Sequence, residues 1–172
     1  MNLWWRLLRL RLTARRRGHA SMWEDGVTRF RVAPTDLDVV GHMNNGRYLT
    51  LLDLGRYDLM KRSGFWATCR SLGWFPVVAG QTITYFKDLR LGQSFDVHTQ
   101  VVGLDDRWVY LRQDLRRGDV LHARAMIRAC FIGDGRRVSV EELVARSGEP
   151  PAPMTVPEWV RSWSTHTADR SV

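Results

Sequence analysis

The chain has 172 residues, of which 44% are hydrophobic and 26% charged, a length and composition that suit one globular domain with its own core. Its formal charge of +8 is uneven: residues 1–17 hold six arginines and no acid, which leaves only +2 for the other 155 residues. A nearly neutral body argues against nucleic acid as a partner, because nucleic-acid-binding domains usually carry a basic patch on the folded surface. The two cysteines lie far apart in no CxxC spacing and indicate neither a disulfide framework nor zinc.

The first 24 residues form a basic, amphipathic segment in which Trp and Leu alternate with Arg. No apolar run in it approaches the length of a membrane-spanning helix. Three interpretations remain open: a short helix lying on an anionic membrane surface through residues 1–17, an organelle-targeting segment, or a docking or disordered extension. We expect a cytoplasmic protein, which the first interpretation would place at the inner face of the membrane.

A strand is predicted over residues 27–32, where side chains alternate, and Pro34 ends it. A long helix is predicted over residues 45–62. Its apolar stripe leaves Asp53 and Asp58 on the polar side, with Asp58 four residues before Arg62 and able to pair with it. Gly55 in mid-helix costs about 1 kcal/mol relative to Ala, so we expect another backbone to approach closely there.

The rest of the predicted domain is mostly strands. Residues 65–73 are expected to form an aromatic loop with a short helical turn, either core packing or a wall of an apolar tunnel. Alternating patterns predict four more strands, at about 77–87, 94–102, 107–115 and 121–132. A capping box at Ser139 predicts a short helix, and residues 148–172 are a Pro/Trp-containing tail with a final helical turn. The fold class is therefore α+β, with an antiparallel sheet covering one long helix.

The loop before the long helix concentrates the polar chemistry: Asp36, Asp38, His42, Asn44 and Asn45. It is not a calcium loop, because its fifth position is Val and its twelfth is Arg, and His42 has no second histidine at metal-ligand spacing, so no metal is expected. A carboxylate beside a helix N-terminus could attack an activated carbonyl or orient a water, while the helix start stabilises the oxyanion. The alternative is purely structural: Asp36 would only form an Asx-turn after Pro34, and Asn44 and Asn45 would only cap the helix.

The run Asp36-x-Asp38-x-x-Gly41-His42-x-Asn44-Asn45-x-x-Tyr48, between a strand and a long helix, resembles the signature of hotdog-fold thioesterases of the 4-hydroxybenzoyl-CoA thioesterase-like group. The run Phe86–Gln93 is similar to the turn that these proteins place between their second and third strands. The resemblance covers about residues 27–145, within a predicted thioesterase-like domain of residues 25–147, and is nearest to the branch that includes thioesterase superfamily member six. It implies a hotdog fold, an antiparallel sheet of about five strands wrapped around one long helix.

The resemblance also implies an activity: hydrolysis of an acyl-CoA or acyl-carrier-protein thioester. Asp38 would act on the thioester, Asp36 would shape the loop, and His42 and Asn44 would orient water or the acyl group. The amides near Asn45 and Gly46 would polarise the thioester carbonyl. Tyr48 would bind substrate. By position, the candidates to bind the phosphates of coenzyme A are Lys87 and Arg90, with Arg112, Arg116 and Arg117 as further cations; the alternative is that these residues only form a solvated edge of the sheet.

Coenzyme A would enter as part of the substrate, with no separate cofactor, and the assembly would be a homodimer or homotetramer. The chain departs from some hotdog enzymes, which use a helix Glu where this helix carries Asp53 and Asp58. One alternative is a non-catalytic acyl-chain or lipid-binding module at a membrane surface. A third hypothesis is hydration of enoyl thioesters, which other hotdog proteins catalyse.

Overall fold

The computed structural model describes residues 2–14 and 18–168. Five long antiparallel strands form one sheet in the order β1-β3-β4-β5-β2, and a two-residue strand, β6, pairs with the end of β5. The strands are β1 (Gly26–Arg31), β2 (Phe75–Tyr85), β3 (Ser94–Leu104), β4 (Val109–Arg117), β5 (Val120–Gly133) and β6 (Arg136–Arg137). All five strands predicted from alternation are present, with ends displaced by up to two residues.

The long helix α2 (Asn45–Arg62) packs against one face of the sheet, and the close approach at Gly55 is made by side chains of the sheet and not by the backbone that we expected. A Cβ at this position would lie 2.9 Å from Val97 Cγ1 and 3.0 Å from Thr99 Oγ1, both on β3. Any larger residue would therefore separate the helix from the sheet. The other helices are α1 (Asn2–Thr13), the 3₁₀ turn η2 (Pro34–Asp36), α3 (Phe65–Ser71), α4 (Val140–Ser147) and α5 (Glu158–Ala168).

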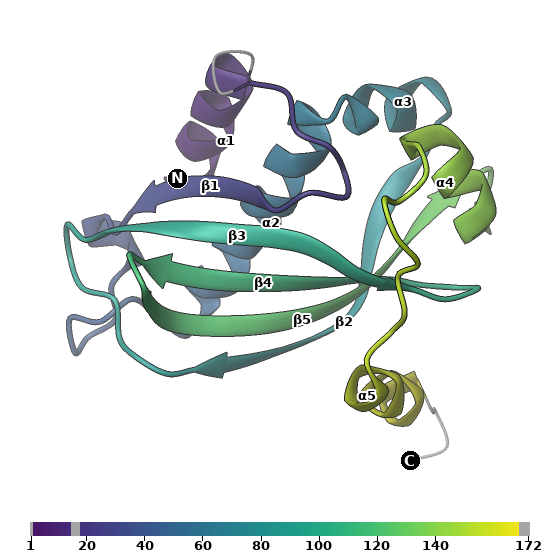
Figure 1. The fold of residues 1–172 in the computed structure, drawn as a ribbon. Coiled ribbons are helices and arrows are strands. Elements are labelled where there is room, and N and C mark those ends of the chain that lie inside the picture. Colours follow the sequence, from purple (N-terminus) through teal and green to yellow (C-terminus); the bar gives the residue numbers. More distant parts are fainter. Residues whose placement is uncertain (1, 15–17, 169–172) are drawn as a thin grey trace.

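The two edges of the sheet differ. The β1 edge is covered by α1, which also packs on α2, whereas β2 forms the opposite edge (Figure 1). β2 has eleven residues, none of them fully buried, and Phe75, Val78 and Tyr85 are exposed. A long edge strand with exposed apolar side chains is a ready template for pairing with another strand.

The packing of α1 corrects one prediction. Asp58 forms the expected pair with Arg62, at 3.9 Å, but it does not lie on a solvent-facing side of α2. It is buried and accepts a 2.7 Å hydrogen bond from Thr28 Oγ1 of β1. The helix is covered by α1 and β1 as well as by the rest of the sheet, so a single apolar stripe does not describe its buried surface.

The tail contains a complete helix, α5, where only a final turn was expected. It packs on the face of the sheet opposite α2, where Tyr110 and Met126 point outward between residues that face the core. Arg128 anchors it by donating to the backbone oxygen and the hydroxyl of Ser164, and the guanidinium lies between the Trp108 and Trp163 rings.

Across residues 2–14 and 18–168, no helix combines the length and hydropathy needed to cross a bilayer.

Candidate active site

The loop between β1 and α2 is closed on itself by its own backbone. The Asp38 N–H donates to the His42 oxygen at 2.8 Å, and Leu37 and Met43 form an isolated antiparallel bridge. Gly41 at the tip has φ +83°, a conformation that disfavours side chains with a Cβ. The loop is therefore a fixed reverse turn that ends at the start of α2.

Asp36 holds the base of this loop. Its side chain is only 2% exposed, and its Oδ2 accepts from the Arg6 guanidinium at 2.5 Å and from the Ala33 N–H at 2.8 Å. Its backbone oxygen accepts from the Asn44 N–H. Asp36 thus links the N-terminal helix, the end of β1 and the cap of α2, and it is turned away from solvent.

Asp38 has a different environment. Its Oδ1 accepts from the Val40 N–H at 2.9 Å and the His42 N–H at 3.1 Å, which is an Asx-turn. Its Oδ2 accepts no hydrogen bond from the described part of the chain, and the residue is half-exposed. One oxygen therefore orients the carboxylate while the other stays accessible to a ligand.

Asn44 caps α2, as predicted: its Oδ1 accepts from the Gly46 N–H at 2.9 Å. The Asn45 N–H at the first helical position has no acceptor among the described residues. One turn further on, Tyr48 is buried edge-on against Tyr85 of β2, with ring centroids 5.1 Å apart. Burial raises the pKa of Tyr48 to about 12, outweighing a hydrogen bond from the Leu89 backbone, so its hydroxyl stays protonated at neutral pH.

His42 lies beside a carboxylate from the turn after β2. Its Nε2 is 3.6 Å from Asp88 Oδ2, and an isolated bridge joins His42 to Arg90. The Arg90 Nε donates to Asp88 at 2.6 Å; this bond is the main reason that the pKa of Asp88 is lowered, and His42 makes a smaller contribution in the same direction. Asp88 therefore remains ionised beside the imidazole.

The 86–93 turn is anchored from the sheet. Buried His122 of β5 donates through Nδ1 to the carbonyl oxygens of Lys87 and Asp88, at 3.2 and 3.0 Å. The Met43 N–H donates to the Leu89 oxygen, which joins the turn to the loop. The loop, the helix start and this turn form one rigid cluster.

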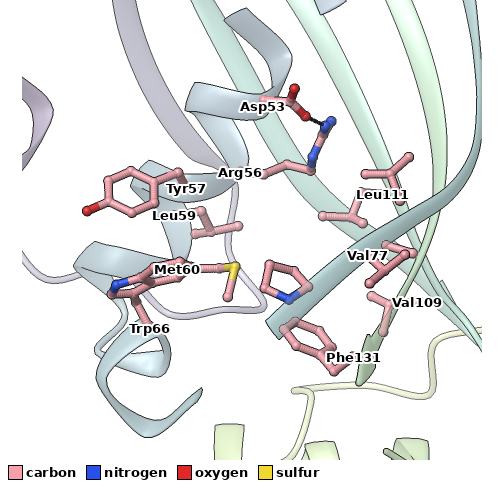
Figure 2. Close-up of a pocket in the computed structure, with 13 residues that line it drawn as sticks. Asp53, Arg56, Tyr57, Leu59, Met60, Trp66, Val77, Val109, Leu111 and Phe131 are labelled. Atoms are coloured by element: carbon pink, nitrogen blue, oxygen red, sulfur yellow. Dashed lines mark hydrogen bonds and ion pairs between the residues drawn. The ribbon is translucent and has the colours of Figure 1, made fainter. Parts of the chain in front are cut away.

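An apolar cavity of about 280 Å³ opens between α2 and the β5–β2 part of the sheet. Met60 and Trp66 form its helical wall, Val77 and Phe131 line its sheet side, and Asp53 and Arg56 form an ion pair at one end (Figure 2). Asp53 and Met60 follow the helix start by eight and fifteen residues, which is about 12 to 22 Å along the axis. Within one chain, the cavity therefore begins about 12 Å along the axis from the helix start, and Asp38 does not line it.

Comparison with known proteins places this geometry in a family. Residues 32–164 match the family model of the thioesterase-like superfamily. The chain belongs to this superfamily. It is 36% identical over 133 residues to protein THEM6 of Xenopus laevis, covering 76% of this chain and 64% of that protein. The chain is also 39% identical over 83 residues to THEM6 of Danio rerio, covering 48% of this chain and 41% of the relative, so it spans less than two thirds of either.

Solved structures of thioesterases share the fold. The probable thioesterase YbaW of Escherichia coli superposes with a TM-score of 0.65 at 25% identity, over 70% of this chain and 94% of that one. The SAV2348 protein of Staphylococcus aureus, solved with CoA, has a TM-score of 0.60 at 17% identity, over 83% and 96% of the two chains. The structural matches confirm the hotdog fold, and the family model and THEM6 relatives confirm the family, that the run from Asp36 to Tyr48 predicted.

Most of the predicted site residues lie together, and three of the predicted cations lie elsewhere. The loop and the helix start hold Asp38, His42, Asn44, Asn45, Gly46 and Tyr48, and the adjoining turn holds Lys87 and Arg90. Arg112 and Arg116 instead line a hollow on the outer face of the sheet, away from α2. Arg117 lines another hollow with Arg29 and Arg31.

Three residues of the cluster escaped sequence reasoning. Asp88 stands in the Phe86–Gln93 run that carried the resemblance, but nothing in the sequence indicates that it lies beside His42. The residues near Arg6 and His122 in the sequence do not predict their contacts, because their partners are 30 and 34 or more residues away.

Proposed function

We propose that the protein hydrolyses acyl-CoA thioesters and that the Asp38 carboxylate acts on the thioester. The observation that carries the proposal is the state of this carboxylate: Oδ1 is fixed by two backbone N–H groups, whereas Oδ2 accepts no hydrogen bond from the described residues, in a loop that leads directly into α2. Membership of the thioesterase-like superfamily and the CoA complex of a protein with the same fold support the substrate class.

The reaction needs few groups. The thioester carbonyl oxygen accepts from the Asn45 N–H, where the helix dipole favours the developing oxyanion. Asp38 Oδ2 either removes a proton from an attacking water or attacks the carbonyl carbon itself to form an acyl anhydride that water then opens. In both cases the C–S bond breaks, CoA leaves as a thiolate that takes up a proton, and the free acid is released. His42, held beside Asp88, orients the water or the acyl group.

The proposal includes a homodimer in which two chains complete each site. The C-terminal end of β2 adjoins the helix start, since the Tyr85 hydroxyl donates to the Asn45 oxygen, while its N-terminal end lines the cavity. Antiparallel pairing of two β2 edges centred near Gly80 sets Phe75 of one chain opposite the partner's Tyr85. The Asp38 loop of each chain then lies beside the cavity of the other, which would hold the acyl group.

Thiol release from a panel of aromatic and aliphatic acyl-CoAs tests the activity. We expect turnover with the wild type and a loss of at least about 100-fold in kcat for Asp38→Asn. The control is Asp106→Asn, which removes an exposed carboxylate from the turn between β3 and β4 and should keep most of the activity. Equal rates for wild type and Asp38→Asn would reject the mechanism, and no release from any acyl-CoA would reject hydrolysis.

A further inference from the structure

The N-terminal helix α1 is held to the domain by one of its faces. Leu10 is buried in the main core, and the Arg6 guanidinium reaches Asp36 and the Arg31 oxygen. Arg11 Nε donates to the Tyr57 hydroxyl at 3.0 Å, which fixes α1 along α2. The helix is thus a docked element, and its orientation relative to the Asp38 loop is set.

The opposite face of α1 is apolar and exposed. Trp4, Trp5 and Leu12 are 73%, 71% and 70% exposed, and Leu8 is exposed between them. Because successive helical residues turn by about 100°, these four side chains lie within one arc of about 100°. Exposed residues of this size usually mark an interaction surface when they are contiguous.

The arc is bordered by cations on both sides. Arg11 precedes it and Arg9 follows it around the helix, and Lys61 and His19 line a hollow beside the C-terminal half of α1. Asp36, the acid that α1 contacts through Arg6, is buried. The residues that border the apolar arc on the helix are therefore basic.

We propose that this face of α1 binds the surface of an anionic phospholipid bilayer, with Trp4, Trp5, Leu8 and Leu12 in the interfacial layer. Tryptophan favours the boundary between acyl chains and headgroups, and flanking arginines can reach the lipid phosphates. A second copy of the chain is a poorer occupant, because twofold packing of this face brings the flanking arginines of both copies together. A single helix of this kind gives reversible binding.

Co-sedimentation with vesicles tests this proposal, using the full chain with phosphatidylcholine alone and with 30% phosphatidylglycerol, about the anionic fraction of many membranes. We expect the wild type to bind the anionic vesicles, less so in high salt, and the double variant Trp4→Ala/Trp5→Ala to bind at least about tenfold more weakly. Trp159→Ala, which removes an exposed tryptophan of α5, is the matched control and should bind like the wild type.

A second measurement uses the unaltered protein: lipids brominated on their acyl chains should quench part of its tryptophan fluorescence. Absence of wild-type binding, or equal binding by the double variant, would overturn the proposal. Self-association that requires Trp4 and Trp5 without vesicle binding would also overturn it and would assign the face to a contact between copies.

Discussion

At the scale of single residues, the two aspartates of the loop differ in what surrounds them. Asp36 is enclosed and bonded to Arg6 and Ala33, so it supports structure; Asp38 presents one oxygen to solvent. Residue types alone do not distinguish them, because both are acids two positions apart. The resemblance assigned the chemistry to Asp38, and the geometry gives a physical reason for that assignment.

Arg6 should matter for stability although it lies in the N-terminal segment. Arg6→Ala removes a charged donor from the buried Asp36 carboxylate, and we expect the free energy of unfolding to fall by about 2 kcal/mol. Urea unfolding measures this change. Arg9→Ala is the control, since Arg9 makes only a 3.3 Å contact to the Arg29 oxygen, and its effect should stay below about 0.5 kcal/mol. Equal effects of the two substitutions would show that Asp36 does not depend on Arg6.

Gly55 tests the close packing of helix and sheet. Gly55→Ala would gain about 1 kcal/mol of helix propensity, but the new Cβ would lie 2.9 Å from Val97 Cγ1. Because overpacking costs about 1 to 3 kcal/mol, we expect a net loss of stability and a lower melting temperature. Lys61→Ala, at an exposed position of the same helix, should change little. A rise in stability for Gly55→Ala would mean that β3 can move away from α2 without a loss of folding free energy.

At the scale of elements, the strands followed from the alternation of their side chains, and α2 followed from the apolar stripe that faces the sheet. Periodicity misplaced Asp58, since α2 also contacts α1 and β1 and therefore buries more than one stripe. It also missed most of α5, whose anchor is Arg128 on a distant strand and not a long apolar stripe of its own. Helices such as α1 and α5 are hard to predict from local sequence, because the residues that they pack against are distant in the chain and come together only in the folded domain.

Helix α4 provides a pH-dependent prediction. A hydrogen bond from Arg136, followed by that from the Ser139 N–H, lowers the pKa of Glu142 from 4.5 to about 2. A carboxyl whose pKa is lower in the folded state stabilises the fold above its unfolded pKa, and this contribution is lost as the pH falls through the folded value. Unfolding measured from pH 6 to 2 should show wild type and Glu142→Gln converging below about pH 4.5. A constant difference down to pH 2 would contradict this linkage; Glu141→Gln, outside the capping box, is the control.

At the scale of the whole molecule, the two edges of the sheet have different surroundings. One edge of the sheet is closed by α1, and the other exposes β2 beside a cavity that the Asp38 loop of the same chain does not line. The sequence predicted the loop and the sheet but not that the Asp38 loop and the cavity are apart, because their relative positions depend on where α2 lies across the strands. The open edge is the reason to expect a dimer.

The proposed dimer can be broken at this edge. Val78→Arg would place a charge on the β2 edge, and we expect a monomer by light scattering; activity does not report on the dimer in this variant, because Val78 also lines the cavity. Val120→Arg is a matched control on β5, because Val120 is 44% exposed and Val78 is 40% exposed. A Val78→Arg protein that remains dimeric would move the interface elsewhere.

Complementation between two inactive chains tests the central claim most directly. One chain carries Asp38→Asn; the other carries Ala129→Phe, which fills the cavity but leaves its loop unchanged. In a mixed dimer, one site combines the normal loop of the second chain with the normal cavity of the first. We expect each variant alone to be inactive and purified mixed dimers to recover about half of the wild-type kcat, one working site in two. Mixed dimers that form but remain inactive would contradict a site shared between chains and centred on Asp38.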